Sequence, residues 1–195
     1  CRRHAIPTAN YRVFDQGRRA AALAHVTTSP LPLVVKADGL AAGKGVVIAT
    51  SRHEAVQAVE AAFAGAFPAA GDTIVVETFL DGDLGPNTAG MGAYSPAPVL
   101  DDGTVDLVME RIIRPTLAGL AAEGSAYRGF LYAGLMLTPE GPKLLEYNVR
   151  FGDPEAQAVL PRLASDMGAL GLAAVEGGLA QTTVAWRAAH GRARV

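Results

Sequence analysis

The chain has 195 residues, of which 50% are hydrophobic and 18% are charged, a composition that supports a sizeable core and excludes an intrinsically disordered protein. A net charge of −2 gives no footprint for a nucleic-acid partner, and no apolar stretch predicts a membrane span. The single cysteine, Cys1, excludes an internal disulfide and fits a reducing, cytoplasmic compartment. Because the first residue is not Met, we expect a fragment of a longer protein.

The first 80 residues predict a small α/β lobe. A loop at the N-terminus leads into an alanine-rich helix over residues 18–25, which residues 27–30 break. Ser51 begins a second helix, because Glu54 follows it at the spacing of a capping box. Three short apolar runs predict strands, which cover residues 33–35, 46–48 and 74–80.

The second half of the chain begins with residues 81–98, which are rich in Gly, Pro, Asn and Asp and indicate a functional or disordered segment. Residues 104–123 predict a long helix that Pro115 should kink. Its expected apolar face comprises Val105, Val108 and Ile112. A short connection between two predicted strands, 129–137 and 143–149, is typical of an antiparallel hairpin. The remaining expectations are helices over residues 154–163 and 165–178, an N-cap at Ser165, and a strand from Thr182 that includes Val184 and Trp186.

Two of the three lysines in the chain, Lys36 and Lys44, lie eight positions apart in one glycine-rich stretch. Glycines allow backbone N–H groups to approach a phosphate closely, and the two ammonium groups supply positive charge. The stretch has neither the spacing of a P-loop nor that of a dinucleotide fingerprint. A plain hairpin with an exposed lysine fits the glycines equally well, although the scarcity of lysine elsewhere favours a phosphate site.

The predicted strand 143–149 carries the second motif. Alternation places Glu146, Asn148 and Arg150 on one face, and it places Leu145, Tyr147 and Val149 on the other. A carboxylate and an amide oxygen two residues apart are ligands suited to Mg²⁺, and Arg150 can neutralise a phosphoryl group. Lys143 falls on the face opposite Glu146, so we interpret it as structural. The polar outer face of an ordinary strand fits the same alternation.

Two further segments adjoin these motifs. Asp153 and Pro154 have the pattern of a helix start, with Glu155 as an acidic residue in the first turn. A simple cap explains this pattern, yet the preceding strand already concentrates polar groups here. The glycines of residues 85–96 suit a backbone cradle for an anion, but a mobile linker has the same composition.

Four motifs, in this order, resemble the phosphoribosylamine–glycine ligase family of the ATP-grasp superfamily. They are residues 36–46 (KADGLAAGKGV), 85–88 (GPNT), 90–94 (GMGAY) and 150–155 (RFGDPE). The resemblance covers nearly the whole chain. It implies an α/β (α+β) ATP-grasp fold, in which a small lid lobe and a larger lobe with an antiparallel sheet bind ATP between them.

The resemblance also implies the domain boundaries and the site residues. Residues 1–28 correspond to an N-terminal segment, and residues 29–80 correspond to the lid lobe. Residues 81–180 correspond to the large lobe with the metal site, and residues 181–195 correspond to the start of a truncated C-terminal domain. The implied nucleotide-binding residues are Lys36, Gly39, Gly43, Lys44, Gly45, Glu77, Thr78, Phe79 and Leu80. The implied substrate-binding residues are Asn87, Thr88, Gly90, Met91, Gly92, Asp153, Pro154 and Glu155. Mg²⁺ or Mn²⁺ is assigned to Glu146 and Asn148, and catalysis to Arg150 and Asp153.

By this resemblance the activity is that of an ATP-dependent carbon–nitrogen ligase of purine biosynthesis. Such an enzyme phosphorylates the glycine carboxylate, and the amine of 5-phosphoribosylamine then displaces phosphate to give glycinamide ribonucleotide. The implied partners are small molecules (ATP, glycine and 5-phosphoribosylamine), and the implied state is a monomer or weak oligomer. The chain departs from the family in three respects: a stretch is missing between Gly82 and Asp83, the N-terminal domain is missing, and Ala89 replaces a glycine. We therefore expect this chain alone to be inactive.

Other interpretations remain open. A different ATP-grasp carboxylate–amine ligase has the same general motifs, but residues 150–155 favour the glycine ligase. The short junction at Gly82–Asp83 favours a non-catalytic remnant that binds nucleotide. A purely structural domain is the least consistent with four ordered motifs.

Overall fold

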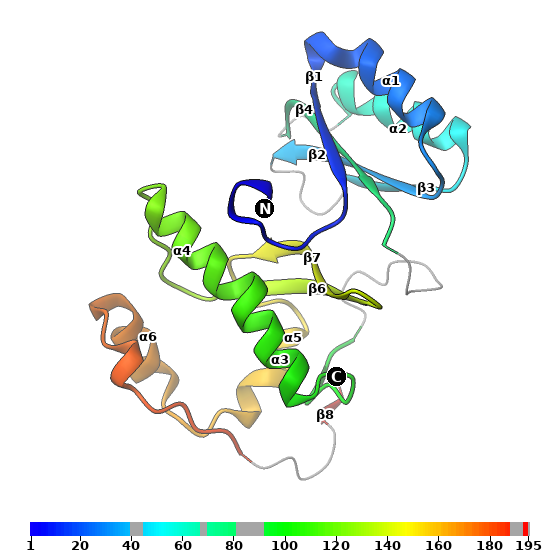
Figure 1. Cartoon of the computed structure of the whole chain (residues 1–195). Helices are drawn as coiled ribbons and strands as arrows, with labels where there is room; N and C mark the ends of the chain where they lie inside the picture. The colour runs from blue at the N-terminus through cyan, green and yellow to red at the C-terminus, as the bar shows by residue number, and fades with distance from the viewer. Residues whose placement is uncertain (40–44, 67–69, 81–91, 188–192, 195) are drawn as a thin grey trace. The chain divides into compact units, whose positions relative to one another are not determined.

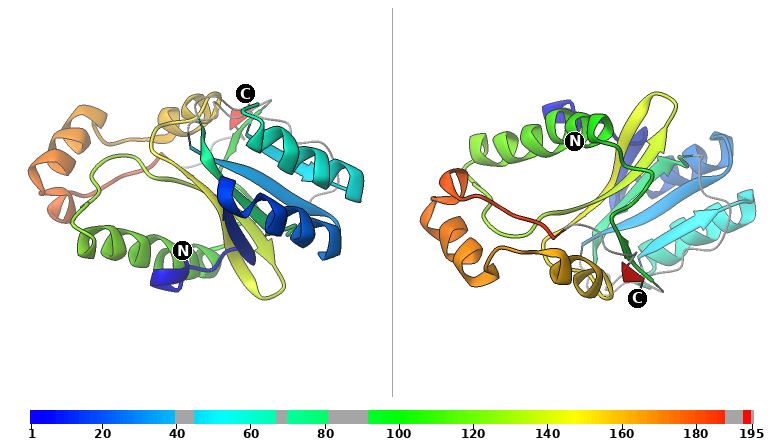
Figure 2. Two further views of the ribbon diagram at one scale, coloured as in Figure 1. Left: turned by 90° about the horizontal axis from the view of Figure 1, so that it is seen from above. Right: turned by 90° about the horizontal axis from the view of Figure 1, so that it is seen from below.

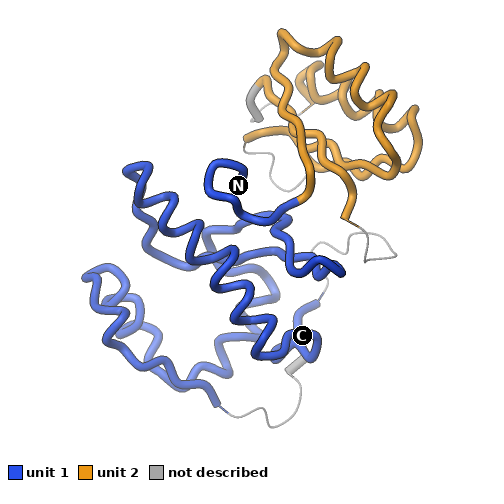
Figure 3. The backbone as a smooth tube through the Cα atoms, viewed as in Figure 1, with its two compact units in different colours: residues 1–8, 82–195 blue, residues 9–81 orange. Residues whose placement is uncertain are grey.

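The computed structural model describes residues 1–39, 45–66, 70–80, 92–187 and 193–194 (Figure 1, Figure 2). It contains two compact units, one formed by residues 9–81 and the other by residues 1–8 with 82–195 (Figure 3). Residues 9–28 therefore belong to the same unit as residues 29–80, which include the predicted lid strands. Within the described ranges, no helix is both long and apolar enough to cross a membrane.

The unit of residues 9–81 is built on a four-stranded antiparallel sheet with the order β1-β4-β2-β3. The strands are β1 (Tyr11–Asp15), β2 (Leu33–Gly39), β3 (Val46–Ala49) and β4 (Ala70–Thr78). The three predicted strands are confirmed as β2, β3 and β4, whereas β1 was not predicted. Only Phe14 is buried in β1, so this edge strand lacks the alternating apolar pattern that would reveal it.

Two helices, α1 (Arg19–Thr28) and α2 (Arg52–Phe63), lie side by side on one face of this sheet (Figure 1, Figure 2). The short 3₁₀ turn η2 (Gln16–Arg18) precedes α1. The capping box of α2 is confirmed, because the Ser51 side chain accepts a hydrogen bond from the Glu54 N–H and the Glu54 carboxylate accepts one from the Ser51 N–H. The core between sheet and helices comprises Phe14, Ala22, Val26, Leu33, Val35, Ala49, Ala55, Ala58, Val59, Ile74 and Val76.

The second unit contains a long helical rod beside a β-hairpin (Figure 1). The rod consists of α3 (Asp102–Val108), the π-helical segment η3 (Met109–Ile113) and α4 (Arg114–Ala122). Pro115 lies in the first turn of α4 and has no N–H to donate to the carbonyl of the residue four positions earlier. The π-helical segment η3 ends just before α4, at the place where the sequence predicted a kink. Of the expected apolar face, Ile112 is fully buried but Val105 is 43% exposed, so the face is narrower than predicted.

The hairpin is formed by β6 (Tyr132–Thr138) and β7 (Gly141–Asn148), which confirms the predicted antiparallel pair. It packs on the rod through a second core of Ile6, Ile112 and Leu144, with Ile113, Ala133, Leu135 and Tyr147 around them. The turn η1 (Arg2–His4) lies on α4, where the His4 ring faces Gly119. A Cβ at Gly119 would lie only 2.6 Å from that ring, so this glycine permits the contact.

The last part of the chain contains four short helical segments, which are α5 (Glu155–Val159), η4 (Leu160–Arg162), α6 (Met167–Glu176) and η5 (Leu179–Gln181). The short strand β8 (Ala193–Arg194) pairs with β5 (Tyr94–Ser95), which precedes the helical rod. The N-cap predicted at Ser165 is wrong. Asp166 caps α6 by accepting from the Ala169 N–H, and the Ser165 hydroxyl instead accepts from Ala185. The strand predicted from Thr182 is also wrong, since Trp186 forms only an isolated bridge with Leu163.

Candidate active site

An ion pair joins two residues assigned to nucleotide binding in the unit of residues 9–81. The Lys36 ammonium on β2 lies 2.7 Å from the Glu77 carboxylate on β4, and the two side chains are 24% and 15% exposed. Leu33 and Val35 face the helices, so strand alternation directs Lys36 to the other face of the sheet. In the β2–β4 pairing, Val34 lies opposite Glu77, so Lys36 reaches Glu77 along a cross-strand diagonal.

The glycine-rich stretch is described only at its ends. Gly39 closes β2 with a φ of 133°, a conformation that favours glycine, and the carbonyl of Gly45 accepts a hydrogen bond from the Ala37 N–H. Gly43 and Lys44 lie outside the described residues, as do Asn87, Thr88, Gly90 and Met91.

The segment that follows β4 is anchored at Thr78. The N–H of Thr78 donates to the carbonyl of Asn10 over 2.9 Å, while Phe79 and Leu80 are half-buried beyond the end of the strand. A cavity of about 190 Å³ borders Glu77 and Thr78, and its other lining residues are Asn10, Tyr11, Arg12, His25, Ser29, Pro30, Leu33 and Val76. Burial, and then the positive charge of Arg12, lower the pKa of the His25 imidazole beside this cavity.

The predicted metal ligands Glu146 and Asn148 lie together on β7 in the other unit. The Asn148 side-chain amide donates to the Glu146 carboxylate over 3.2 Å, which confirms that both side chains share a face. Strand β7 also contains a β-bulge, because Gly134 pairs with Glu146 while the next residue, Leu135, pairs with Leu144. Leu145 is therefore the extra residue, and it is exposed instead of sharing the face of Tyr147 as the alternation predicted.

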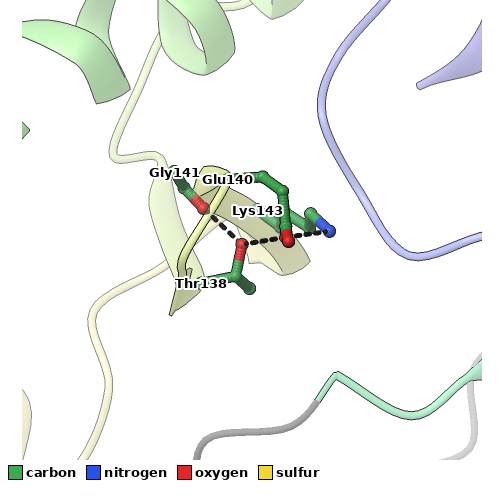
Figure 4. Close-up of polar contacts among 4 residues, drawn as sticks. All are labelled: Thr138, Glu140, Gly141 and Lys143. Carbon is green, nitrogen blue, oxygen red and sulfur yellow. Dashed lines mark hydrogen bonds and ion pairs between the residues drawn. The ribbon is translucent and has the colours of Figure 1, made fainter.

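The bulge resets which residues of β7 share a face. Leu144 and Tyr147, three positions apart, both pack in the core beneath the helical rod. Their neighbours Lys143 and Glu146 consequently share the opposite face, so the expectation that Lys143 lies opposite Glu146 is wrong. Lys143 itself pairs with Glu140 at the hairpin turn over 3.1 Å, and the Thr138 hydroxyl lies 2.9 Å from the same carboxylate (Figure 4).

The core side of β7 is fixed by hydrogen bonds on either side of the bulge. The Leu144 N–H donates to the Pro7 carbonyl over 2.8 Å, and the Thr8 hydroxyl donates to the Leu144 carbonyl over 2.7 Å. The Tyr147 hydroxyl lies 2.5 Å from the hydroxyl of Thr116, which donates to the carbonyl of Ile112 in the π segment. Since Thr116 uses its only hydroxyl proton for that bond, Tyr147 donates to Thr116.

Two residues of β6 that the motifs did not indicate, Tyr132 and Gly134, border the ligand pair. Tyr132 pairs with Asn148 and Gly134 with Glu146. Burial raises the pKa of Tyr132, and the negative charges of Glu155 and Glu146 raise it further. The only signal in the sequence is the spacing within the hairpin, and the bulge makes that spacing ambiguous.

The loop between β7 and α5 carries the residues assigned to catalysis and substrate binding. The ring of Phe151 contacts the Phe130 ring at 4.3 Å between centroids, which attaches this loop to the chain before β6. Arg150 donates to the carbonyl of Phe151, and the Asp153 carboxylate accepts from the Gln157 side chain over 2.7 Å. The N-cap of α5 is Pro154, not Asp153, so the expected position of Pro154 inside the helix is off by one residue. Gly92, at the end of the glycine-rich segment, is exposed.

The donor set on β7 fits a magnesium or manganese ion. Within the described residues, no group of three or more His, Cys, Asp or Glu side chains could hold a metal. Mg²⁺ does not require such a group, because it commonly retains several waters and binds one or two protein oxygens together with substrate phosphates. One carboxylate and one amide oxygen on a single face meet that requirement.

The model of the family described as "Phosphoribosylglycinamide synthetase, ATP-grasp (A) domain" matches residues 1–84 and 78–156. The phosphoribosylamine–glycine ligase of Mesorhizobium japonicum is 46% identical over 96% of this chain and 50% of its own length. The crystal structure of the phosphoribosylamine–glycine ligase of Thermotoga maritima matches 99% of this chain and 55% of its own, with 32% identity and a TM-score of 0.82. The crystal structure of biotin carboxylase from Campylobacter jejuni matches 90% of this chain and 44% of its own, with 17% identity and a TM-score of 0.64. At this identity the match shows only that the two proteins share the ATP-grasp fold.

The chain spans about half the length of the curated relatives that it matches. Its alignment with the Mesorhizobium ligase extends over 216 residues, more than the 195 residues of the chain, so the relative has residues that this chain lacks. The two matched segments of the family model overlap over residues 78–84, which include the junction of Gly82 and Asp83. Since the family model matches well over half of the residues, the chain belongs to the phosphoribosylglycinamide synthetase ATP-grasp (A) domain family.

Proposed function

We propose that this chain is the ATP-grasp core of an ATP-dependent ligase that joins glycine to 5-phosphoribosylamine through a glycyl phosphate. The observation that carries the proposal is the Glu146–Asn148 pair, which lies on one face of β7 with a donor set suited to Mg²⁺. Membership of the family and the names of its relatives support the identity of the two substrates. The products are glycinamide ribonucleotide, ADP and phosphate.

Each assigned residue has a defined task in this proposal. The oxygens of Glu146 and Asn148 would hold a Mg²⁺ or Mn²⁺ ion, which would supply positive charge to neutralise phosphoryl oxygens. Lys36, which Glu77 orients, binds a phosphate oxygen of ATP together with Lys44. Arg150 neutralises the transferring phosphoryl group, and Asp153 acts with it in the loop that binds the substrates. Such a transfer depends on positioning and charge, so it requires no protein nucleophile.

The proposed partners are the small molecules ATP, glycine and 5-phosphoribosylamine. The net charge of −2 gives no electrostatic reason to expect a nucleic-acid partner. We assign the protein to the cytoplasm as a monomer or weak oligomer. Mg²⁺ and Mn²⁺ are both compatible with one carboxylate and one amide ligand.

Calorimetric titration of the 195-residue chain with Mg·ATP tests the nucleotide and metal assignments. We expect Lys36→Ala and Glu146→Ala each to weaken binding about tenfold or more, because a charge-assisted bond contributes about 1.5–3 kcal/mol. Lys143→Ala is the matched control for Lys36, since its ammonium also pairs with a glutamate but at the hairpin turn. Equal binding by the parent and the Glu146→Ala variant would refute the metal assignment.

A non-catalytic nucleotide-binding remnant is the second candidate, and the short junction at Gly82–Asp83 favours it. The chain also lacks about half of the length of its relatives. We therefore expect Mg·ATP binding without glycine-dependent release of ADP. Release of ADP that 5-phosphoribosylamine stimulates, at the rate of an intact ligase, would show that the chain retains the complete reaction.

A further inference from the structure

The side chain of Glu146 lies over a glycine of the neighbouring strand. Gly134 on β6 pairs directly with Glu146 across the hairpin. A Cβ built on Gly134 would lie 3.1 Å from the Cγ of Glu146, closer than side-chain carbons normally approach. The other neighbours of that Cβ, the Glu146 carbonyl and the Tyr132 ring, are both at 3.6 Å, which is an ordinary contact. Among the residues that the structure describes, the Glu146 side chain is therefore the close contact that an added side chain at position 134 would crowd.

The backbone of Gly134 does not itself require glycine. Gly39 and Gly141 have a positive φ, but Gly134 is not among the residues in that conformation. Glycine inside a strand normally weakens it, because it has no side chain to pack and loses more entropy on folding. Its presence opposite Glu146 therefore needs another reason, and the space that it leaves for the Glu146 side chain provides one.

We propose that Gly134 is a positioning residue for the carboxylate of Glu146, an inference that rests on the proposed assignment of Glu146 to a metal ion. A methyl group at position 134 displaces the Glu146 Cγ by a few tenths of an ångström, and the carboxylate moves with it. Mg²⁺ requires nearly ideal octahedral geometry at about 2.0–2.1 Å, so it tolerates little displacement of a ligand. Residues that orient metal ligands typically change metal affinity about 10- to 100-fold when they are replaced.

The test uses Gly134→Ala in the 195-residue chain, with Mn²⁺ as the probe and electron paramagnetic resonance as the measure of free ion. We expect the dissociation constant for Mn²⁺ to rise about tenfold. Gly171→Ala is the matched control, because a Cβ at Gly171 meets no atom within 4 Å and should leave the dissociation constant unchanged.

A second measurement separates positioning from a general effect on the fold. We expect Gly134→Ala to lower the thermal unfolding midpoint of the parent, because the added methyl group crowds the Glu146 Cγ. In a Glu146→Ala background that Cγ is gone, so Gly134→Ala should not lower the midpoint. A structural role independent of Glu146 would instead lower the midpoint equally in both backgrounds, and this result would overturn the inference.

The outcomes also separate this inference from the proposed function. If Glu146→Ala abolishes Mn²⁺ binding but Gly134→Ala binds Mn²⁺ like the parent, the positioning role is refuted and the metal assignment stands. If the parent binds Mn²⁺ no better than Glu146→Ala, the metal assignment fails and the inference fails with it. The metal assignment and the positioning role are both supported if Gly134→Ala weakens Mn²⁺ binding and lowers the unfolding midpoint only when Glu146 is present.

Discussion

Replacing Thr116 with Val removes the middle member of a buried hydrogen-bond chain behind the proposed metal strand. Thr116 is 7% exposed, donates to the Ile112 carbonyl over 2.7 Å and accepts from Tyr147 over 2.5 Å. After the substitution, the Tyr147 hydroxyl retains only the Ile112 carbonyl at 3.5 Å, which is a poor bond. Tyr147 is only partly buried, but Thr116→Val removes two hydrogen bonds at about 0.5–1.5 kcal/mol each, so we expect the free energy of unfolding to fall by about 1–3 kcal/mol.

Tyr147→Phe should cost less than Thr116→Val. It leaves the bond from Thr116 to Ile112 intact and removes one hydrogen bond, for which we expect about 0.5–1.5 kcal/mol. Urea unfolding measures the free energy of unfolding of both variants. Tyr127→Phe is the matched control, because the Tyr127 hydroxyl donates to the Phe130 carbonyl at the surface. A larger loss for Tyr147→Phe than for Thr116→Val would refute the assignment of donor and acceptor.

Two other predictions concern the N-terminal turn and the capping box. Gly119→Ala forces a Cβ against the His4 ring, so urea unfolding should not show the gain of about 1 kcal/mol that alanine normally gives over glycine inside a helix, and a gain of that size would mean that His4 does not pack there. The hydrogen bonds from Thr50, and then those from Ser51, lower the pKa of Glu54. The ionised Glu54 side chain therefore stabilises the fold above the ordinary carboxyl pKa of 4.5, and this stabilisation disappears as the pH falls through the lower pKa of the folded state. Glu54→Gln should therefore be less stable than the parent at pH 7 but equal to it at acidic pH, and an equal difference at both pH values would contradict this.

Local sequence signals predicted the elements whose causes are local. The capping box at Ser51 specified α2, and the apolar runs specified three strands of one sheet. Strand β1 was missed because its position depends on pairing with β4, from which it is separated by most of that unit. In the same way, the cap at Asp166 replaced Ser165 because the Ser165 hydroxyl contacts residue 185, which is distant in sequence.

The candidate site was predicted only in part, because some of its features depend on contacts between residues that are distant in sequence. The spacing of Glu146 and Asn148 was sufficient to predict a shared face, because strand alternation holds beyond the bulge. It could not predict that Tyr132 and Gly134 border these ligands, since that depends on the register of two strands. The sequence LLEYN permits either leucine to face the core, and tertiary packing selects Leu144.

The bulge at Leu145 leads to a prediction about deletion that distinguishes it from a regular strand. In a regular strand, removing one residue turns every side chain on one side of the cut to the opposite face. Leu145 is the extra residue of the bulge, so its deletion should leave Leu144 and Tyr147 in the core and Glu146 on the opposite face. Deletion of Met136, from the regular part of β6, is the matched control and should move core residues to the surface.

We therefore expect the Leu145 deletion to retain a cooperative urea transition at a midpoint well above that of the Met136 deletion. Its calorimetric titration with Mg·ATP should still depend on Glu146, because the carboxylate remains on its face. Equal destabilisation by the two deletions would mean that Leu145 is an ordinary strand residue. In that case Leu144 and Tyr147 could not both face the core, and the position of Glu146 relative to Gly134 would have to be assigned again.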